Sequence, residues 1–248
     1  MALKIGFLGM SDNRATELML SKLSEKGIDL RIIILQKPNL RTSWRRFKSK
    51  LKSSGIFSTM SRVIYALTKK LDQNLLDKKE SNNIFLVSSL NNDRSKELIL
   101  NSELDLLLLC TDQMISRRIF SIPKLGTLNA HPGWIPTYRG LGSLDSMISD
   151  GYYPAISVHF VDEGVDTGQL VMRETLDSSC LGDSEEVEKN VHEWQANMFV
   201  KSIKLLESGN YEEIDTFFER SSMTRGFTKR QRKKIYSLYN EEDLIKLN

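Results

Sequence analysis

The stretch KIGFLGMSDN, residues 4–13, predicts how the fold of this chain begins. Its first part is a short apolar run that ends in glycine, and its last four residues resemble a turn. A segment with helical periodicity comes next, so the expected order is strand, turn and helix. This unit begins many folds that alternate strands with helices.

Three further apolar runs lie in the first half of the chain, at residues 30–35, 83–87 and 104–110. Residues 92–100 have helical spacing and separate the last two runs. Strands that are apolar throughout and alternate with helices indicate a parallel sheet that is buried on both faces. We therefore expect an α/β fold with a doubly wound, mostly parallel sheet.

The pattern changes after residue 150. Residues 154–161 alternate in polarity, residues 164–168 are rich in turn formers, and residues 169–176 continue as a strand, which predicts an antiparallel hairpin at a sheet edge. An apolar stripe from Val187 to Leu206 predicts a long C-terminal helix, with a capping-box spacing before it at Asp183.

Residues 220–234 are basic and poor in apolar side chains. We expect a short irregular extension there, without a second core. The predicted organisation is one domain over residues 1–209 and a C-terminal extension over residues 210–248.

Composition limits the class of protein. A chain of 248 residues with 40% hydrophobic and 27% charged residues can build one substantial core. Its longest apolar run is far shorter than the roughly 20 residues that cross a bilayer, and no secretory signal precedes Asp12, so we expect a cytoplasmic protein. Cys110 and Cys180 lack the spacing of a disulfide framework or a zinc site, and no metal site is expected.

Charge is distributed unevenly. The net charge of +3 is too small to imply nucleic-acid binding, but residues 37–71 contain many lysines and arginines and no acidic residue. One interpretation is a pair of amphipathic helices with solvated basic faces. The other is a face that attracts an anion, such as a phosphorylated substrate, a folate polyglutamate tail or a membrane that carries a lipid-linked acceptor. The sequence leaves both open.

The strongest chemical signal is GTLNAHPGWIPTYRG, residues 126–140, which begins as a strand and becomes a loop rich in proline and glycine. Asn129 and His131 lie two apart, so on a strand both side chains project from one face. An asparagine amide can stabilise a developing oxyanion, and a histidine can relay protons near neutral pH. These properties indicate an acyl or phosphoryl transfer site.

An acidic turn follows at residues 161–168. A carboxylate near His131 would raise the pKa of the imidazole and select its tautomer. The other two histidines have simpler interpretations. His159 lies within an alternating strand, where we favour a structural hydrogen bond, and His192 is expected on the surface of the long helix.

Two motifs carry a family resemblance. The residues NAHPGWIP, 129–136, followed by a glycine four residues later, resemble the Asn-x-His-Pro-Ser/Gly-x-x-Pro-x-x-x-Gly signature of the folate-dependent formyltransferases. The residues DEGVDTGQ, 162–169, are similar to the acidic turn of that family. The resemblance extends over about residues 4–207. It implies a Rossmann-like formyltransferase fold and 10-formyltetrahydrofolate as the donor of the formyl group.

The resemblance also implies roles for individual residues. Asn129 would polarise the formyl oxygen, His131 would stabilise the tetrahedral intermediate, and Asp166 would accept a proton from the attacking amine and orient His131. The residues expected around the folate donor are Cys110, Thr111, Asp112, Gln113, Met114, Ile115, Asp162, Glu163, Gly164 and Val165. The residues expected to contact the acceptor are Ser11, Asn13, Tyr138, Arg139 and Gly140.

The acceptor is inferred by elimination within the family. Glycinamide ribonucleotide formyltransferases resemble this chain but carry a Gly-x-Gly-Ser-Asn loop, of which residues 9–13 keep only a part. Methionyl-tRNA formyltransferases add a C-terminal β domain, for which the residues after Gly209 are too few. We therefore expect the amine of a nucleotide-linked amino sugar, used for a surface polysaccharide such as lipopolysaccharide. A glycinamide ribonucleotide or methionyl-tRNA formyltransferase is the alternative, and the basic residues 225–234 keep the tRNA acceptor open. Nucleic acid is not expected as a partner, and a homodimer is one option for assembly.

Two alternatives use the same residues differently. A formyltetrahydrofolate hydrolase would place water where the amine attacks. A non-catalytic folate-binding scaffold would be expected to have lost part of the reaction centre, whereas Asn129, His131 and Asp166 are all present.

Overall fold

The computed structural model describes residues 2–38, 83–176, 184–209, 214, 223–224, 226–238, 244–245 and 247. Most of the basic stretch at residues 37–71 lies outside the described residues, as do Cys180 and Asp183. The interpretations offered for those positions therefore stay predictions.

The N-terminal half alternates strands and helices as its apolar pattern predicts. Its elements are β1 (Ile5–Met10), α1 (Arg14–Glu25), β2 (Leu30–Gln36), β3 (Ile84–Val87), α3 (Asp93–Ser102), β4 (Leu106–Cys110), α4 (Arg117–Phe120) and β5 (Gly126–His131). The short β6 (Arg139–Gly140) and α5 (Ser143–Ser149) follow.

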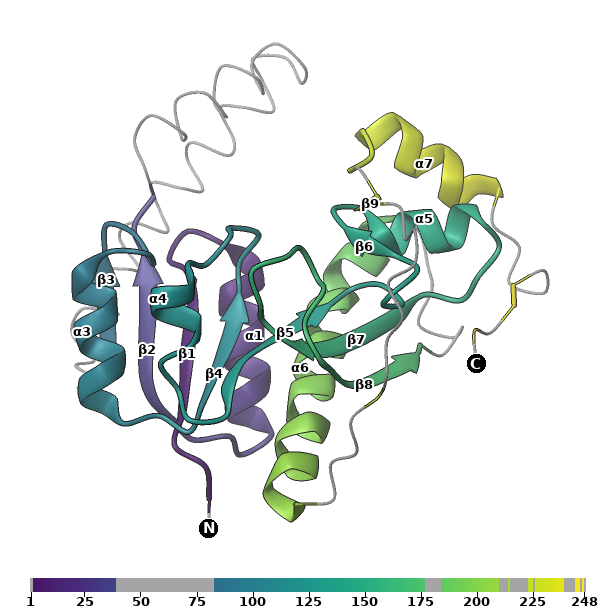
Figure 1. Cartoon of the computed structure of the whole chain (residues 1–248). Helices are drawn as coiled ribbons and strands as arrows, with labels where there is room; N and C mark the ends of the chain where they lie inside the picture. The colour runs from purple at the N-terminus through teal and green to yellow at the C-terminus, as the bar shows by residue number, and fades with distance from the viewer. Residues whose placement is uncertain are drawn as a thin grey trace.

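One seven-stranded sheet organises the described chain, with strand order β3-β2-β1-β4-β5-β7-β8 (Figure 1). The strands from β3 to β5 in this order are parallel, whereas β7 (Ala155–Phe160) and β8 (Leu170–Thr175) form an antiparallel hairpin beside β5. The chain reverses its winding direction between β1 and β4. The predicted doubly wound sheet with an antiparallel edge hairpin is confirmed.

Burial on both faces explains why the central strands are apolar throughout. Phe7 of β1 and Leu108 of β4 belong to a core that also contains residues of α1 and of the long helix α6 (Ser184–Ser208). Leu8 and Leu107 point the other way, into a second core with α3 and α4. Side chains alternate between faces along a strand, so both sets must be apolar.

Close packing holds the first turn in place. A Cβ at Gly9 would lie 2.9 Å from Thr16 Oγ1, so only glycine lets the end of β1 approach α1 this closely. The long helix α6 is confirmed as predicted, and it covers β5 and β7. Within the described residues, no helix combines the length and the apolar character that a membrane span requires.

The expectation that the C-terminal extension is irregular is wrong for part of the segment. Helix α7 spans Lys229–Leu238, and β9 (Met223–Thr224) pairs with β6 in a second, two-stranded sheet. A small third cluster is built by Trp134, Tyr138, Met147 and Ala155, with Leu247 packed against it. The division at residue 209 stays a prediction.

Candidate active site

The candidate site lies on one face of β5 and β7. These strands pair antiparallel, so that Asn129 is opposite His159 and His131 is opposite Ser157. All four side chains therefore share a face. The residues that alternate with them along the two strands point to the opposite face and form the core beneath α6. They are Leu128, Ala130, Ile156 and Val158.

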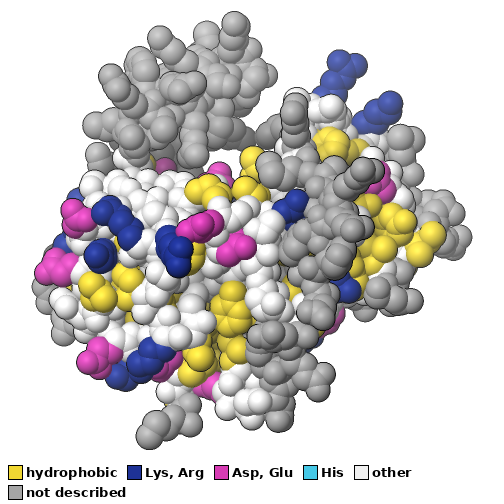
Figure 2. Space-filling model, viewed as in Figure 1, with side chains coloured by type: hydrophobic (Ala, Val, Ile, Leu, Met, Phe, Trp, Pro, Cys, Tyr) yellow, Lys and Arg dark blue, Asp and Glu magenta, His cyan; other side chains and the backbone are white. Residues whose placement is uncertain are grey.

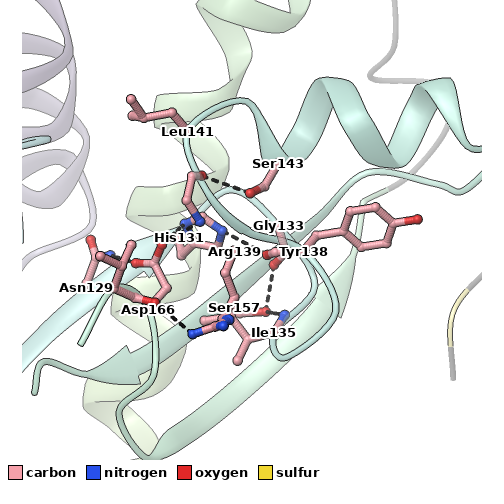
Figure 3. A network of polar contacts seen from close by, with 12 residues as sticks. Asn129, His131, Gly133, Ile135, Tyr138, Arg139, Leu141, Ser143, Ser157 and Asp166 are labelled. Carbon is pink, nitrogen blue, oxygen red and sulfur yellow. Dashed lines mark hydrogen bonds and ion pairs between the residues drawn. The ribbon is translucent and has the colours of Figure 1, made fainter. Parts of the chain in front are cut away.

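The turn between β7 and β8 brings Asp166 over this polar face (Figure 3). Asp166 Oδ2 lies 3.3 Å from His131 Nδ1, and Oδ1 lies 3.4 Å from His159 Nε2. Asn129 Nδ2 donates to Oδ1 at 3.3 Å. The structure thus brings together the three residues predicted as the reaction centre.

Local interactions shape the turn that carries Asp166. Asp166 has a φ of 52°, a left-handed conformation that is uncommon for residues other than glycine. Asp162 Oδ1 accepts hydrogen bonds from the amide of Gly164 and from the Thr167 hydroxyl. A Cβ at Gly168 would lie 1.8 Å from the carbonyl oxygen of Phe160, so glycine is required there. The turn is held tightly enough to keep one carboxylate in position.

His131 is buried between two hydrogen-bond acceptors. Its Nε2 lies 3.1 Å from the carbonyl oxygen of Tyr138, and its Nδ1 faces Asp166. A Cβ at Gly133 would lie 2.6 Å from His131 Nε2, so this glycine lets the loop fold back over the ring. Burial lowers the pKa of His131 below 6.5, and the charge of Asp166 opposes that shift only in part. A neutral ring can donate to one acceptor, whereas a protonated ring would satisfy both.

Asp166 is held as a carboxylate. Burial by itself would raise its pKa, but the hydrogen bond to His159 and the charges of His131 and His159 outweigh that effect, with help from the backbone amide of Gly140. The Gly140 amide donates to Oδ2 at 2.9 Å. The resulting pKa lies below the ordinary 3.8, so Asp166 stays ionised at neutral pH and can accept hydrogen bonds.

His159 belongs to the site, which the sequence interpretation missed. Its Nδ1 donates to the carbonyl oxygen of Phe160 at 2.8 Å, and its Nε2 lies 3.3 Å from Asn129 Nδ2 and 3.4 Å from Asp166 Oδ1. The usable signal was the spacing of Ser157 and His159, two polar residues two apart on a strand, as in the pair on β5. Ser157 supports the loop, since its hydroxyl donates to the Gly133 carbonyl at 2.7 Å.

The loop expected to hold the folate donor follows β4. Its backbone is braced by a hydrogen bond from Asn91 Nδ2 to the carbonyl of Met114, while the Met114 side chain is 56% exposed. Burial raises the pKa of Cys110 to about 11, so this residue is a neutral thiol.

Arg117, just after the loop, forms an exposed ion pair with Glu163 of the acidic turn at 3.3 Å. The two loops predicted to surround the donor are therefore neighbours. The remaining residues predicted there lie on these two loops: Thr111, Asp112, Gln113, Ile115, Asp162, Gly164 and Val165.

The residues expected to contact the acceptor fall into two groups. Ser11 donates to the carbonyl of Gln36, and Asn13 Oδ1 accepts from the Ala15 amide at the start of α1, so both stabilise the turn after β1. Arg139 donates to the carbonyl of Val165 at 3.2 Å. It lies with Tyr138 and Gly140 on the loop that flanks Asp166. The backbone of this loop contacts the reaction centre, through the Tyr138 carbonyl at His131 and the Gly140 amide at Asp166. The Tyr138 side chain points elsewhere and donates to Asp150 at 2.9 Å. Acceptor binding by all five residues stays a prediction.

Comparison with known proteins identifies the family. The family model described as formyl transferase matches residues 30–203, well over half of the chain. The methionyl-tRNA formyltransferase of Methylacidiphilum infernorum is 27% identical over 133 residues, which cover 53% of this chain and 42% of that protein. The same-named protein of Caldicellulosiruptor saccharolyticus is 29% identical over 93 residues, which cover 37% of this chain and 30% of that protein. The chain thus spans less than half the length of these relatives.

Solved structures share the fold. A 4-N formyltransferase from Francisella tularensis has a TM-score of 0.56 at 15% identity, covering 96% of this chain and 88% of that one. Phosphoribosylglycinamide formyltransferase from Streptococcus pneumoniae has a TM-score of 0.52 at 14% identity, covering 83% of this chain and 99% of that one. At these identities the likeness concerns the fold alone. The family model, which matches more than half of the chain, shows that this chain belongs to the formyl transferase family.

Proposed function

We propose that this protein transfers a formyl group from 10-formyltetrahydrofolate to the primary amine of an amino sugar carried on a nucleotide, for synthesis of a surface polysaccharide. The observation that carries the proposal is the convergence of Asn129, His131 and Asp166 on one polar sheet face, with Asp166 Oδ2 3.3 Å from His131 Nδ1. An amide, a buried imidazole and an ionised carboxylate are the groups that acyl transfer to an amine requires.

The reaction assigns each side chain a task. The amine nitrogen bonds to the formyl carbon, the carbonyl becomes an oxyanion, and the bond from that carbon to the folate nitrogen then breaks. The Asn129 side-chain amide, which donates to Asp166 in the structure, donates to the oxyanion during the reaction. His131 becomes easier to protonate as negative charge develops, since a protonated ring donates to both of its neighbouring acceptors. Asp166 accepts the proton that the amine loses, directly or through water, and the leaving folate nitrogen takes up a proton.

The donor would occupy the region between the loop after β4 and the acidic turn. The ion pair between Arg117 and Glu163 links these segments at their exposed rim. The apolar side chain of Met114 is exposed on the first of them, where it could cover an aromatic ring. Backbone groups of both loops would supply the hydrogen bonds to the ring, which is why few side chains there have a recognisable pattern.

The names of similar proteins offer three candidate acceptors, and one structural neighbour supports the amino sugar. The Francisella tularensis structure, named a 4-N formyltransferase, matches this chain over nearly the whole length of both. The relatives found by sequence are named methionyl-tRNA formyltransferases, which makes methionyl-tRNA the second candidate acceptor. Phosphoribosylglycinamide is a third, from the name of another structural neighbour.

A panel of acceptors tests the proposal. The protein is incubated with 10-formyltetrahydrofolate and, separately, with nucleotide-linked 3-amino and 4-amino dideoxysugars, methionyl-tRNA, phosphoribosylglycinamide and buffer alone, and products are followed by mass. Gain of one formyl group on an amino sugar is the expected result. His131→Ala should lose most of this turnover while staying folded.

Each other result contradicts part of the proposal. Reaction with methionyl-tRNA or phosphoribosylglycinamide alone would replace the acceptor. Loss of the formyl group in buffer alone would indicate a hydrolase, and absence of donor binding would indicate an inert scaffold. Unchanged transfer by His131→Ala would reject the mechanism.

A further inference from the structure

The loop that contacts Asp166 is itself held by the C-terminal segment. Strand β9 pairs in parallel with β6, so that Gly140 lies beside Thr224. Gly140 is the residue whose backbone amide donates to Asp166 Oδ2 at 2.9 Å. A chain segment more than 80 residues away in sequence therefore borders the backbone group that fixes the carboxylate.

The Thr224 hydroxyl is the centre of this contact. It lies 2.7 Å from the carbonyl oxygen of Arg139 and 3.1 Å from that of Leu141. The Ser143 hydroxyl lies 2.8 Å from Thr224 Oγ1 and 2.8 Å from the carbonyl oxygen of Gly140. Two hydroxyl hydrogens thus serve three successive backbone carbonyls, and each hydroxyl also lies within hydrogen-bond distance of the other. Removing the Thr224 hydroxyl takes away the side-chain donor that lies nearest to the carbonyl oxygens of Arg139 and Leu141.

Helix α7 anchors the segment that carries Thr224. Asp145 of α5 is 7% exposed, and it accepts hydrogen bonds from Arg232 Nε at 3.1 Å and from the Tyr236 hydroxyl at 3.0 Å. Other basic side chains of α7, including Arg230 and Lys233, are exposed, and Figure 2 shows dark-blue side chains projecting where α7 lies. Arg232 is instead turned inward to a buried carboxylate. The helix is thereby fixed to the element that follows the loop.

We propose that Thr224 is a positioning residue for Asp166, acting through the loop of residues 139–141. The expected effect of Thr224 on turnover rests on the proposed function. The claim that Thr224 holds the loop of residues 139–141 does not. It also extends the site beyond the family match, which ends at residue 203. The reaction centre would then depend in this chain on a segment that lies outside the matched region.

The test compares Thr224→Val with Thr224→Ser, which restores the hydroxyl. Thr175→Val on β8 is the matched control, because it makes the same exchange on a strand away from this loop. Amide hydrogen exchange of Gly140, followed by NMR, reports the bond to Asp166 without requiring an acceptor. We expect Thr224→Val to lower the protection of Gly140 at least about tenfold and to lower kcat by a similar factor, with little change in the KM of the donor. Thr224→Ser should restore both, and Thr175→Val should change neither.

The outcomes separate this inference from the proposed function. Undiminished protection of Gly140 in folded Thr224→Val would overturn it, whatever the enzyme transfers. Lost protection with unchanged kcat would overturn the link to catalysis. If the unmodified protein transfers no formyl group to any amine, the proposed function fails, while hydrogen exchange still decides whether Thr224 holds the loop.

Discussion

The two faces of the β5–β7 pair are built from the same strands but are buried in different ways. Leu128 and Val158 lie under α6, whose apolar side chains fill the space around them. Asn129 and His159 lie on the other face, under a turn that contributes the carboxylate of Asp166. The first face is stabilised by removing apolar surface from water, whereas the second is tolerated because its polar groups bond to one another. Adjacent residues on one strand therefore serve stability and chemistry separately.

The largest expected effect is a loss of turnover when a residue on the polar face of β5 and β7 is replaced. Asn129→Ala removes the amide that bonds to Asp166 and that would stabilise the oxyanion, so we expect kcat to fall about 10²- to 10³-fold. The free energy of unfolding should fall by only about 1 kcal/mol, the typical net value of such hydrogen bonds. Steady-state kinetics and urea unfolding measure the two quantities on the same preparation. A variant that transfers formyl groups at the original rate would remove Asn129 from the mechanism.

The neighbouring residue should show the opposite pattern. Leu128→Ala deletes a fully buried side chain under α6, and the free energy of unfolding should fall by about 2–5 kcal/mol. The rate per folded molecule should change far less than in Asn129→Ala. Urea unfolding, with kinetics at a temperature where the variant stays folded, checks this. If Leu128→Ala instead lost turnover as Asn129→Ala does, the two faces would not be functionally separate.

A smaller effect should appear in the pH dependence of stability. Burial lowers the pKa of His131 from its ordinary 6.5 in the folded protein. Below about pH 6.5, His131 of the unfolded chain is therefore protonated more readily than His131 of the folded chain. The free energy of unfolding should therefore fall as the pH falls below 6.5, by about 1.4 kcal/mol for each unit of the shift.

His131→Asn should reduce the slope of unfolding free energy between pH 7.5 and 5.5, because it removes this group while His159 and His192 stay. Urea unfolding at several pH values gives the comparison. An identical slope in both proteins would mean that His131 is not buried in its neutral form.

The smallest effect is expected at the exposed rim of the polar face. Arg117 and Glu163 are 76% and 70% exposed, so their ion pair should contribute at most about 0.5 kcal/mol. Glu163→Gln should leave both the unfolding free energy and kcat nearly unchanged, as thermal unfolding and kinetics would show. A large loss of turnover would mean that the acidic turn is held from its rim, and not by the bonds of Asp166 to the strands.

Much of the fold could be predicted because the deciding signals are local. Continuous apolar runs at β1 and β4 indicate strands that are covered on both faces. The spacing of Asn129 and His131 places them on one face because side chains alternate along any strand. These features depend on a few consecutive residues and on backbone geometry that all chains share.

What the tertiary structure decided involves partners that are distant in sequence. His159 joins the site only because the β5–β7 register sets it opposite Asn129, and a shift by one residue would turn it to the core. Helix α7 and β9 were missed because their partners lie on α5 and β6, not in their own sequence. The sequence by itself therefore determined the strands and pointed to the three residues that we propose as the reacting groups. Strand register and long-range packing determined which groups meet, because no local pattern encodes contacts between segments tens of residues apart.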